Sequence, residues 1–138
     1  MDTLTPGQRS ERMRRIKGQD TKPEMRVRRV LHGLGLRYRL QARELPGRPD
    51  IVFRRRKLAI FVHGCFWHRH PDPTCKLARL PKSRLEFWRP KLEANRARDV
   101  ENQASLESKG WKVLVLWECQ TRDTHVVESL VREALRES

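Results

Sequence analysis

The sequence has few cysteines, little acidic charge and no long apolar run. Its 138 residues include only 3 cysteines, an odd number that argues against a disulfide framework and favours a reducing compartment. No apolar run approaches the roughly 20 residues that a membrane-spanning helix needs, and we recognise no signal-peptide core. We therefore expect no membrane association and a single domain over residues 1–138, in the cytoplasm or on the nucleoid.

Acidic residues are scarce beside basic ones. Lys and Arg number 31 against 17 Asp and Glu, which gives a formal net charge of +14. The excess is concentrated early, with 17 basic and 6 acidic residues between Met1 and Lys57. A surface of this charge attracts polyanions, and nucleic acid is the first candidate. We expect residues 1–20 to form a basic amino-terminal arm that becomes ordered on a charged partner.

Hydrophobic periodicity predicts an α/β chain. We expect helices over Lys22–Leu34, Ser83–Gly110 and Thr124–Arg136, and strands over Leu36–Leu40, Ile51–Phe53, Leu58–Val62 and Trp111–Trp117. Ser83 and Glu86 fit a capping box, and Pro90 predicts a kink or a division of the long helix. The basic run Arg54–Lys57 is typical of a hairpin turn, and strand, helix, strand implies that the last strand lies parallel to the one ending at Val62.

Cysteine and histidine gather after the second hairpin strand. Cys65, His70 and Cys75 lie in this loop, and Cys119 follows the last predicted strand by two residues. Thiolate and imidazole are the ligands that structural zinc prefers, usually four in number. The spacing matches no common zinc finger, so buried thiols with a surface imidazole are the alternative. We predict a zinc site.

A second group of polar residues suits phosphodiester hydrolysis. Asp50 opens the first hairpin strand and His63 ends the second, so antiparallel pairing brings them to the same end. A carboxylate can hold Mg²⁺, and an imidazole such as His63 or His68 can act as general acid or base. Each has a structural alternative, and Glu24 in particular is explained by a capping box with Thr21.

Aromatic residues lie in and near the cysteine loop. Apolar wedges between base steps unstack and kink a duplex, and Phe66 and Trp67 are placed to act in this way. Trp88 fits either this role or a core position. Because one of two adjacent aromatics on a helix normally faces the core, we assign Phe87 to it. The core is also our assignment for Trp111 and Trp117.

Several sequence runs together resemble one family of nucleases. They are GRPDIVF at 47–53, HGCFWHRH at 63–70, EFW at 86–88, GWKVLVLWEC at 110–119 and the opening run RMRRIKGQDTKPE at 12–24. Over nearly the whole chain they are similar to the very-short-patch repair (Vsr) DNA mismatch endonucleases.

The resemblance implies a restriction-endonuclease-like fold of the PD-(D/E)XK type, a central mixed sheet flanked by helices, with a structural zinc loop. It implies a Mg²⁺-dependent nick on the 5′ side of the thymine in a T·G mismatch that arises from deamination of 5-methylcytosine. Asp50 and the main-chain carbonyl of Val62 would hold Mg²⁺. His68 would be the general base or acid, His63 would assist at the phosphate, and Glu24 would hold water at the metal.

The resemblance also assigns zinc to the cysteine and histidine set and intercalation to Phe66, Trp67 and Trp88. The implied partner is double-stranded DNA, bound by a bacterial monomer, with repair and polymerase factors as possible further partners. The chain departs from the family's best-known member, which has Thr at the position of Val62, and it lacks the lysine usual in the wider superfamily. Two alternatives stay open: a zinc-stabilised DNA-binding module without catalysis, and a restriction-type nuclease without mismatch preference.

Overall fold

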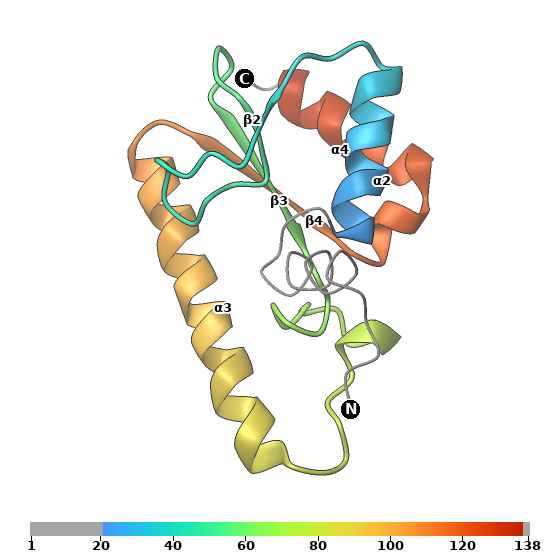
Figure 1. Ribbon diagram of the computed structural model, residues 1–138, viewed down its shortest axis with the longest axis vertical. Helices are drawn as coiled ribbons and strands as arrows, with labels where there is room; N and C mark the ends of the chain where they lie inside the picture. The colour runs from blue at the N-terminus through green and yellow to red at the C-terminus, as the bar shows by residue number, and fades with distance from the viewer. Residues whose placement is uncertain (1–20, 137–138) are drawn as a thin grey trace, which may run out of the picture.

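A four-stranded sheet lies between one long helix and a pair of shorter ones (Figure 1). The computed structural model describes residues 21–136, so the predicted basic arm over residues 1–20 lies outside the described residues. The elements are α2 (Lys22–Gly33), β1 (Arg39–Leu40), β2 (Ile51–Phe53), β3 (Leu58–His63), η1 (Lys76–Ala78), α3 (Leu85–Ser108), β4 (Lys112–Trp117), η2 (Gln120–Arg122) and α4 (Thr124–Arg136). Among the described helices, none is both long and apolar enough to cross a membrane.

The strand order is β1-β2-β3-β4, and the sheet is mixed. β2 and β3 form the predicted antiparallel hairpin, with Ile51 opposite Ile60. β4 runs parallel to β3, with His63 opposite Trp117, which confirms the predicted crossover through α3. The carboxyl-terminal ends of β3 and β4 and the amino-terminal end of β2 therefore lie side by side at the same end of the sheet.

Alternate residues of the central strands supply a core on each face of the sheet. Ile51 and Ile60 face α2 and α4, whose buried side chains include Val27 and Val131. Val52, Ala59 and Phe61 face α3 and pack with Leu106. This second core is smaller, because only the carboxyl-terminal part of α3 packs on the sheet. Figure 1 shows the amino-terminal half of the helix extending beyond it.

The start of α3 differs from the prediction. Arg84 holds the N-cap position with a left-handed backbone (φ 59°), and no side chain caps the helix. The predicted capping box of Ser83 and Glu86 is therefore wrong. Pro90 does not divide the helix, because the carbonyl that it leaves unbonded, that of Glu86, belongs to an exposed turn where water can satisfy it. The predicted strand Leu36–Leu40 is also shorter, since only Arg39 and Leu40 pair with β2.

The loop that leads to β2 depends on a glycine. Gly47 has a φ of +75°, and a Cβ at this position would lie 2.9 Å from the Cβ of Asn102 in α3. Both the backbone conformation and the close approach therefore favour glycine. This packing fixes the path of the residues that deliver Asp50 to the sheet.

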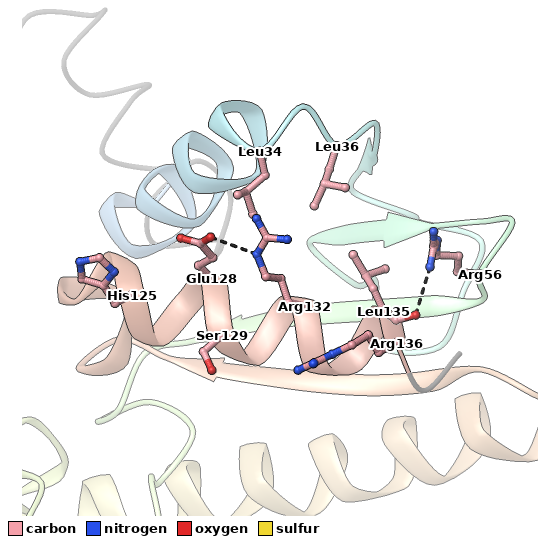
Figure 2. A pocket seen from close by; sticks show the side chains of 9 residues that line it. All are labelled: Leu34, Leu36, Arg56, His125, Glu128, Ser129, Arg132, Leu135 and Arg136. Carbon is pink, nitrogen blue, oxygen red and sulfur yellow. Dashed lines mark hydrogen bonds and ion pairs between the residues drawn. The ribbon is translucent and has the colours of Figure 1, made fainter.

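A cavity of about 590 Å³ runs along α4, from His125 to Arg136, and is also lined by residues that follow α2 and by Arg56 of the β2–β3 turn (Figure 2). Arg56 donates a hydrogen bond to the carbonyl of Leu135 at its rim (3.0 Å), and Arg132 pairs with Glu128. Because the β2–β3 turn is at the opposite end of β3 from His63, this cavity is separate from the polar cluster described next.

Candidate active site and metal centre

Asp50 lies at the start of β2 with its carboxylate turned toward β3. Its Oδ2 accepts a hydrogen bond from the main-chain N–H of Val62 (2.8 Å), and the residue is only 9% exposed. The predicted meeting of Asp50 with the end of β3 is therefore confirmed. A carboxylate is a hard oxygen donor of the kind that Mg²⁺ accepts, and this one lies beside the main chain of Val62.

Glu24 is buried at 1% exposure and faces the same region from α2. Its main-chain N–H bonds to the hydroxyl of Thr21, but its carboxylate accepts from Gln41 (3.2 Å) and Arg28 (3.2 Å). The capping-box explanation of Glu24 is thus only half right, because its side chain points inward rather than back to the cap.

Burial raises the pKa values of both Glu24 and Asp50. Burial raises the pKa of Asp50 well above its usual value, and the charge of Glu24 raises it further. Burial also raises the pKa of Glu24, although bonds to Asp50, Gln41 and Arg28 oppose this. Two buried carboxyl groups that resist ionisation together form a site whose charge a divalent cation would neutralise.

His63 is a neutral, fixed imidazole. It is 5% exposed, and burial, together with the charge of His68, lowers its pKa to about 3. The ring packs edge-on against Trp117 (5.3 Å between centroids) and near Phe61 (5.6 Å). It also lies face to face with the ring of His68, at 3.9 Å and an interplanar angle of 7°. The two predicted histidines are therefore brought together.

His68 has a carboxylate partner, Asp99, that was not predicted from the sequence. Its Nδ1 lies 2.6 Å from Oδ2 of Asp99, which projects from the middle of α3. A carboxylate at Nδ1 fixes the orientation and tautomer of an imidazole. One signal was available: Leu92, Asp99 and Leu106 are seven residues apart, and both leucines are buried. Asp99 therefore lies on the inward face of α3.

The cysteine and histidine set converges. One ligand atom from each of Cys65, His70, Cys75 and Cys119 lies within 4.8 Å of all the others, and the group could hold a metal ion. Sγ of Cys119 is 3.6 Å from Nδ1 of His70, and the Cys119 N–H donates to Sγ of Cys65 (3.5 Å). Three sulfurs and one nitrogen at these separations suit a tetrahedral ion such as zinc.

The thiol of Cys65 is fully buried, and burial raises its pKa to about 12. Burial also raises the pKa of Cys119. Without an ion these thiols stay protonated, so metal binding must displace protons from them. The fit of the four ligands to a metal is thus chemical as well as geometric.

The predicted wedge residues form one cluster. Phe66, Trp67 and Trp88 contact one another edge to face, with ring centroids 5.2–5.7 Å apart. Trp67 is 51% exposed, and the amide of Asn95 donates to its carbonyl (3.3 Å). The cluster projects from the end of the sheet that carries the histidines.

Two of the aromatic residues assigned to the core, Phe87 and Trp117, lie outside it, whereas Trp111 packs against it as predicted. Phe87 is exposed at 41% rather than buried, and its ring lies between the cationic groups of Arg84 (4.8 Å) and Lys91 (4.7 Å). The sheet does not extend beneath this end of α3, so no core is available to it. Trp117 is half-buried and stacks on His70 (4.4 Å), so it belongs to the metal centre rather than to the core. Trp111 is half-buried and packs at the edge of the α3 core.

Comparison with known proteins identifies the family. The profile described as DNA mismatch endonuclease Vsr matches residues 1–75. A type II nicking enzyme from Xanthomonas oryzae pv. oryzae is 48% identical over 97% of this chain and 96% of its own length. The chain belongs to the Vsr DNA mismatch endonuclease family. It is therefore a DNA endonuclease, and the Vsr resemblance seen in its motifs is confirmed.

Further Vsr relatives cover both the candidate active site and the candidate metal centre. The DNA mismatch endonuclease Vsr of Escherichia coli is 44% identical over 94% of this chain and 79% of its own length. A type II nicking enzyme from Neisseria meningitidis is 38% identical over 99% and 95%, respectively. These matches include residues of β2, β3, α3 and β4, so the Vsr likeness extends to every element of the site.

Proposed function

We propose that the protein is a Mg²⁺-dependent mismatch endonuclease. It nicks one strand on the 5′ side of the thymine in a T·G mismatch left by deamination of 5-methylcytosine, and so begins very-short-patch repair. The observation that supports this proposal is that Asp50, bonded to the main-chain N–H of Val62, and the stacked pair His63 and His68 lie at the same end of the β2–β3 hairpin. A carboxylate can hold the metal ion that activates water, and an imidazole can serve as general acid or base in phosphodiester cleavage.

Asp50 and the main-chain carbonyl of Val62 would hold Mg²⁺, which when bound neutralises charge on the phosphate and activates water. Glu24 supports this position, because its buried carboxyl sets the charge around Asp50. The raised pKa values of both residues support a cation here, since a cation would stabilise their ionised forms.

In this proposal His68 moves the proton during cleavage. Asp99 holds Nδ1 of His68, so Nε2 is left to face the reacting oxygen atoms. His63 stays neutral because it is buried, and its ring supports that of His68 and can contact the phosphate. Two imidazoles with different environments can take different roles at one pH. They replace the lysine of related nucleases.

Zinc bound by Cys65, His70, Cys75 and Cys119 would be structural. Four protein ligands leave no open position for a reactant, which is typical of a structural site. The fold that we propose is of the restriction-endonuclease-like PD-(D/E)XK type. Its support is the acidic residue at the start of β2 in a mixed sheet that has helices on both faces.

Phe66, Trp67 and Trp88 would open the duplex beside the mismatch. Their mutual edge-to-face contacts keep the exposed ring of Trp67 in place before DNA arrives. A mismatched step costs less to unstack than a paired one, so wedge insertion favours mismatches. The +14 charge supports a duplex as substrate, bound by a monomer that hands the nick to repair and polymerase factors.

A nicking assay tests the proposal. A duplex with one T·G pair in a methyltransferase-type site, incubated with Mg²⁺, should give a single nick in the thymine strand, while Asp50→Ala should give none. If both strands of the T·G duplex stayed intact with the wild-type protein, the proposal would be refuted. Tight binding without cleavage, unchanged by EDTA, would instead identify a DNA-binding module, and equal cleavage of fully paired DNA would identify a nuclease without mismatch preference.

A further inference from the structure

His63, His68 and Asp99 form a compact set of metal donors. A ring nitrogen from each histidine and a carboxylate oxygen of Asp99 all lie within 4.8 Å of one another. They come from the end of β3, the turn after it and the middle of α3. The donors are two nitrogens and one oxygen, unlike the sulfur-rich cysteine set and unlike the oxygen atoms offered by Asp50 and Val62.

The surrounding structure holds this set in place without DNA. The two imidazole rings are parallel to within 7°, and Nδ1 of His68 is 2.6 Å from the Asp99 carboxylate. Trp117 packs against the buried ring of His63. The main chain of His68 is also fixed, because its N–H donates to the carbonyl of Gly64 (3.1 Å). Imidazole nitrogens bind metals in the plane of the ring, so one of the two stacked rings must turn for both to reach one ion, while the main chain of His68 and the Asp99 carboxylate are already in place.

The chemistry of the donors selects the ion. Imidazole suits Zn²⁺, Co²⁺, Ni²⁺ and Cu²⁺, whereas Mg²⁺ prefers oxygen donors and gives up water reluctantly. Two histidines and one carboxylate also leave coordination positions open to water. His63 is the buried member of the set, at 5% exposure. The solvent-accessible members are His68 and Asp99, with side chains 30% and 22% exposed.

We propose that His63, His68 and Asp99 form a transition-metal site, distinct from both the Mg²⁺ and the cysteine sites, whose occupation inhibits the nuclease. An ion on Nδ1 of His68 replaces its contact with Asp99 and leaves the proton of the neutral ring on Nε2, which then cannot accept a proton during cleavage. The inhibitory half rests on the proposed function. The binding half does not, because it concerns only the free protein.

Co²⁺ is a suitable probe, because its absorption spectrum reports the ligands. Protein already loaded with zinc, and without DNA, is titrated with Co²⁺ in the presence of excess Mg²⁺. We expect one Co²⁺ per chain in addition to the resident zinc, with ligand-field bands but no thiolate-to-metal charge-transfer band. A charge-transfer band that accompanies zinc release would place the Co²⁺ on the cysteines and overturn the proposal, as would the absence of saturable binding.

Variants locate the ion. His68→Gln and Asp99→Asn should each weaken Co²⁺ binding by at least about 10–100-fold, the usual cost of disturbing a metal's protein partners. His125→Gln is the matched control, because His125 is exposed on α4, an element that supplies none of the three proposed ligands. Unaltered zinc content and melting temperature would show that the variants fold. Loss of binding in His125→Gln, with His68→Gln unaffected, would assign the ion to the surface and refute the site.

Nicking of the T·G duplex is then measured at fixed excess Mg²⁺ and rising Co²⁺. The proposal expects the rate to fall with the same half-saturation as the spectral titration. Co²⁺ that binds at the cluster while the rate stays constant would refute the inhibitory half. If Mg²⁺ alone supports no nicking, the proposed function fails, yet the titration still decides whether the site exists.

Discussion

Replacing Asp50 with Asn is expected to stabilise the protein while it abolishes nicking. Asn has nearly the same shape, and its carbonyl oxygen can still accept the hydrogen bond from Val62 that Asp50 accepts at 2.8 Å. The substitution removes a buried carboxyl group whose pKa is raised by burial and by the neighbouring Glu24. It also adds an amide that can donate to Glu24. The proposed Mg²⁺ ligand is lost.

The stabilisation can be bounded from the charges. Two unit charges about 4 Å apart repel by about 4 kcal/mol at an effective dielectric constant near 20. Proton uptake by the pair and the bonds to Glu24 relieve part of this, so we expect a gain of about 1–2 kcal/mol in the free energy of unfolding. For a chain of this size that is a rise of about 3–8 °C in melting temperature.

The sign of the pH dependence follows from the raised pKa values. A carboxyl whose pKa is higher in the folded protein costs stability above that pKa, and the cost disappears as the pH falls to the unfolded value, about 4. The advantage of Asp50→Asn over the wild type should therefore be largest near about pH 8 and shrink toward about pH 4.

Thermal unfolding of the zinc-loaded proteins, without and with Mg²⁺, measures this effect. Mg²⁺ should raise the melting temperature of the wild type but not that of Asp50→Asn. Glu101→Gln, an exposed carboxyl change on α3, should leave both unchanged. A melting temperature for Asp50→Asn at or below that of the wild type at high pH, with a normal circular dichroism spectrum, would refute the idea that the pair is destabilising.

The remaining predictions concern other parts of the site. Asp99→Asn should slow single-turnover nicking by about 10²–10⁴-fold with DNA affinity unchanged, and an unaltered rate would show that His68 works without this carboxylate. Cys119→Ser should lower zinc content and melting temperature, measured by metal analysis and calorimetry; full zinc occupancy would contradict the four-ligand set. Trp67→Ala should weaken mismatch binding by about 1–3 kcal/mol in an anisotropy assay, with little change in melting temperature because half of the residue is exposed. Gly47→Ala should destabilise the fold by about 1–3 kcal/mol through its positive φ and its contact with Asn102; wild-type stability would mean that the loop can move.

The central sheet could be predicted because its signals are local. Apolar runs of strand length on either side of Arg54–Lys57 specify a hairpin, and a helix between two strands specifies a parallel crossover. These two rules together place Asp50, His63 and Cys119 at the same end of the sheet. The exact register of the strands is not needed to place these residues, because the end of a sheet is set by where its strands begin and end.

What could not be predicted depends on where α3 lies. Its apolar residues are few, so its pattern does not show how much of it leaves the sheet, and Phe87 was assigned to a core that does not reach it. The left-handed Arg84 at its start has no sequence signature, because that conformation is normally marked by glycine. Asp99 was missed for the related reason that a charge in a polar helix normally faces solvent.

The candidate metal centre and the proposed catalytic residues are linked through the ends of β3 and β4. His63 and Trp117 are paired across β3 and β4, and Cys65 and Cys119 each follow two residues later. The N–H of Cys119 donates to Sγ of Cys65, so the thiols tie the two strand ends together. The turn that carries His68 begins at Cys65. At the other end of this turn, the N–H of His70 donates a hydrogen bond to the carbonyl of Cys65 (3.0 Å). An ion that contacts no reacting atom can therefore control the distance from His68 to Asp99, and loss of that ion should reduce the rate of proton transfer before it reduces the affinity for DNA.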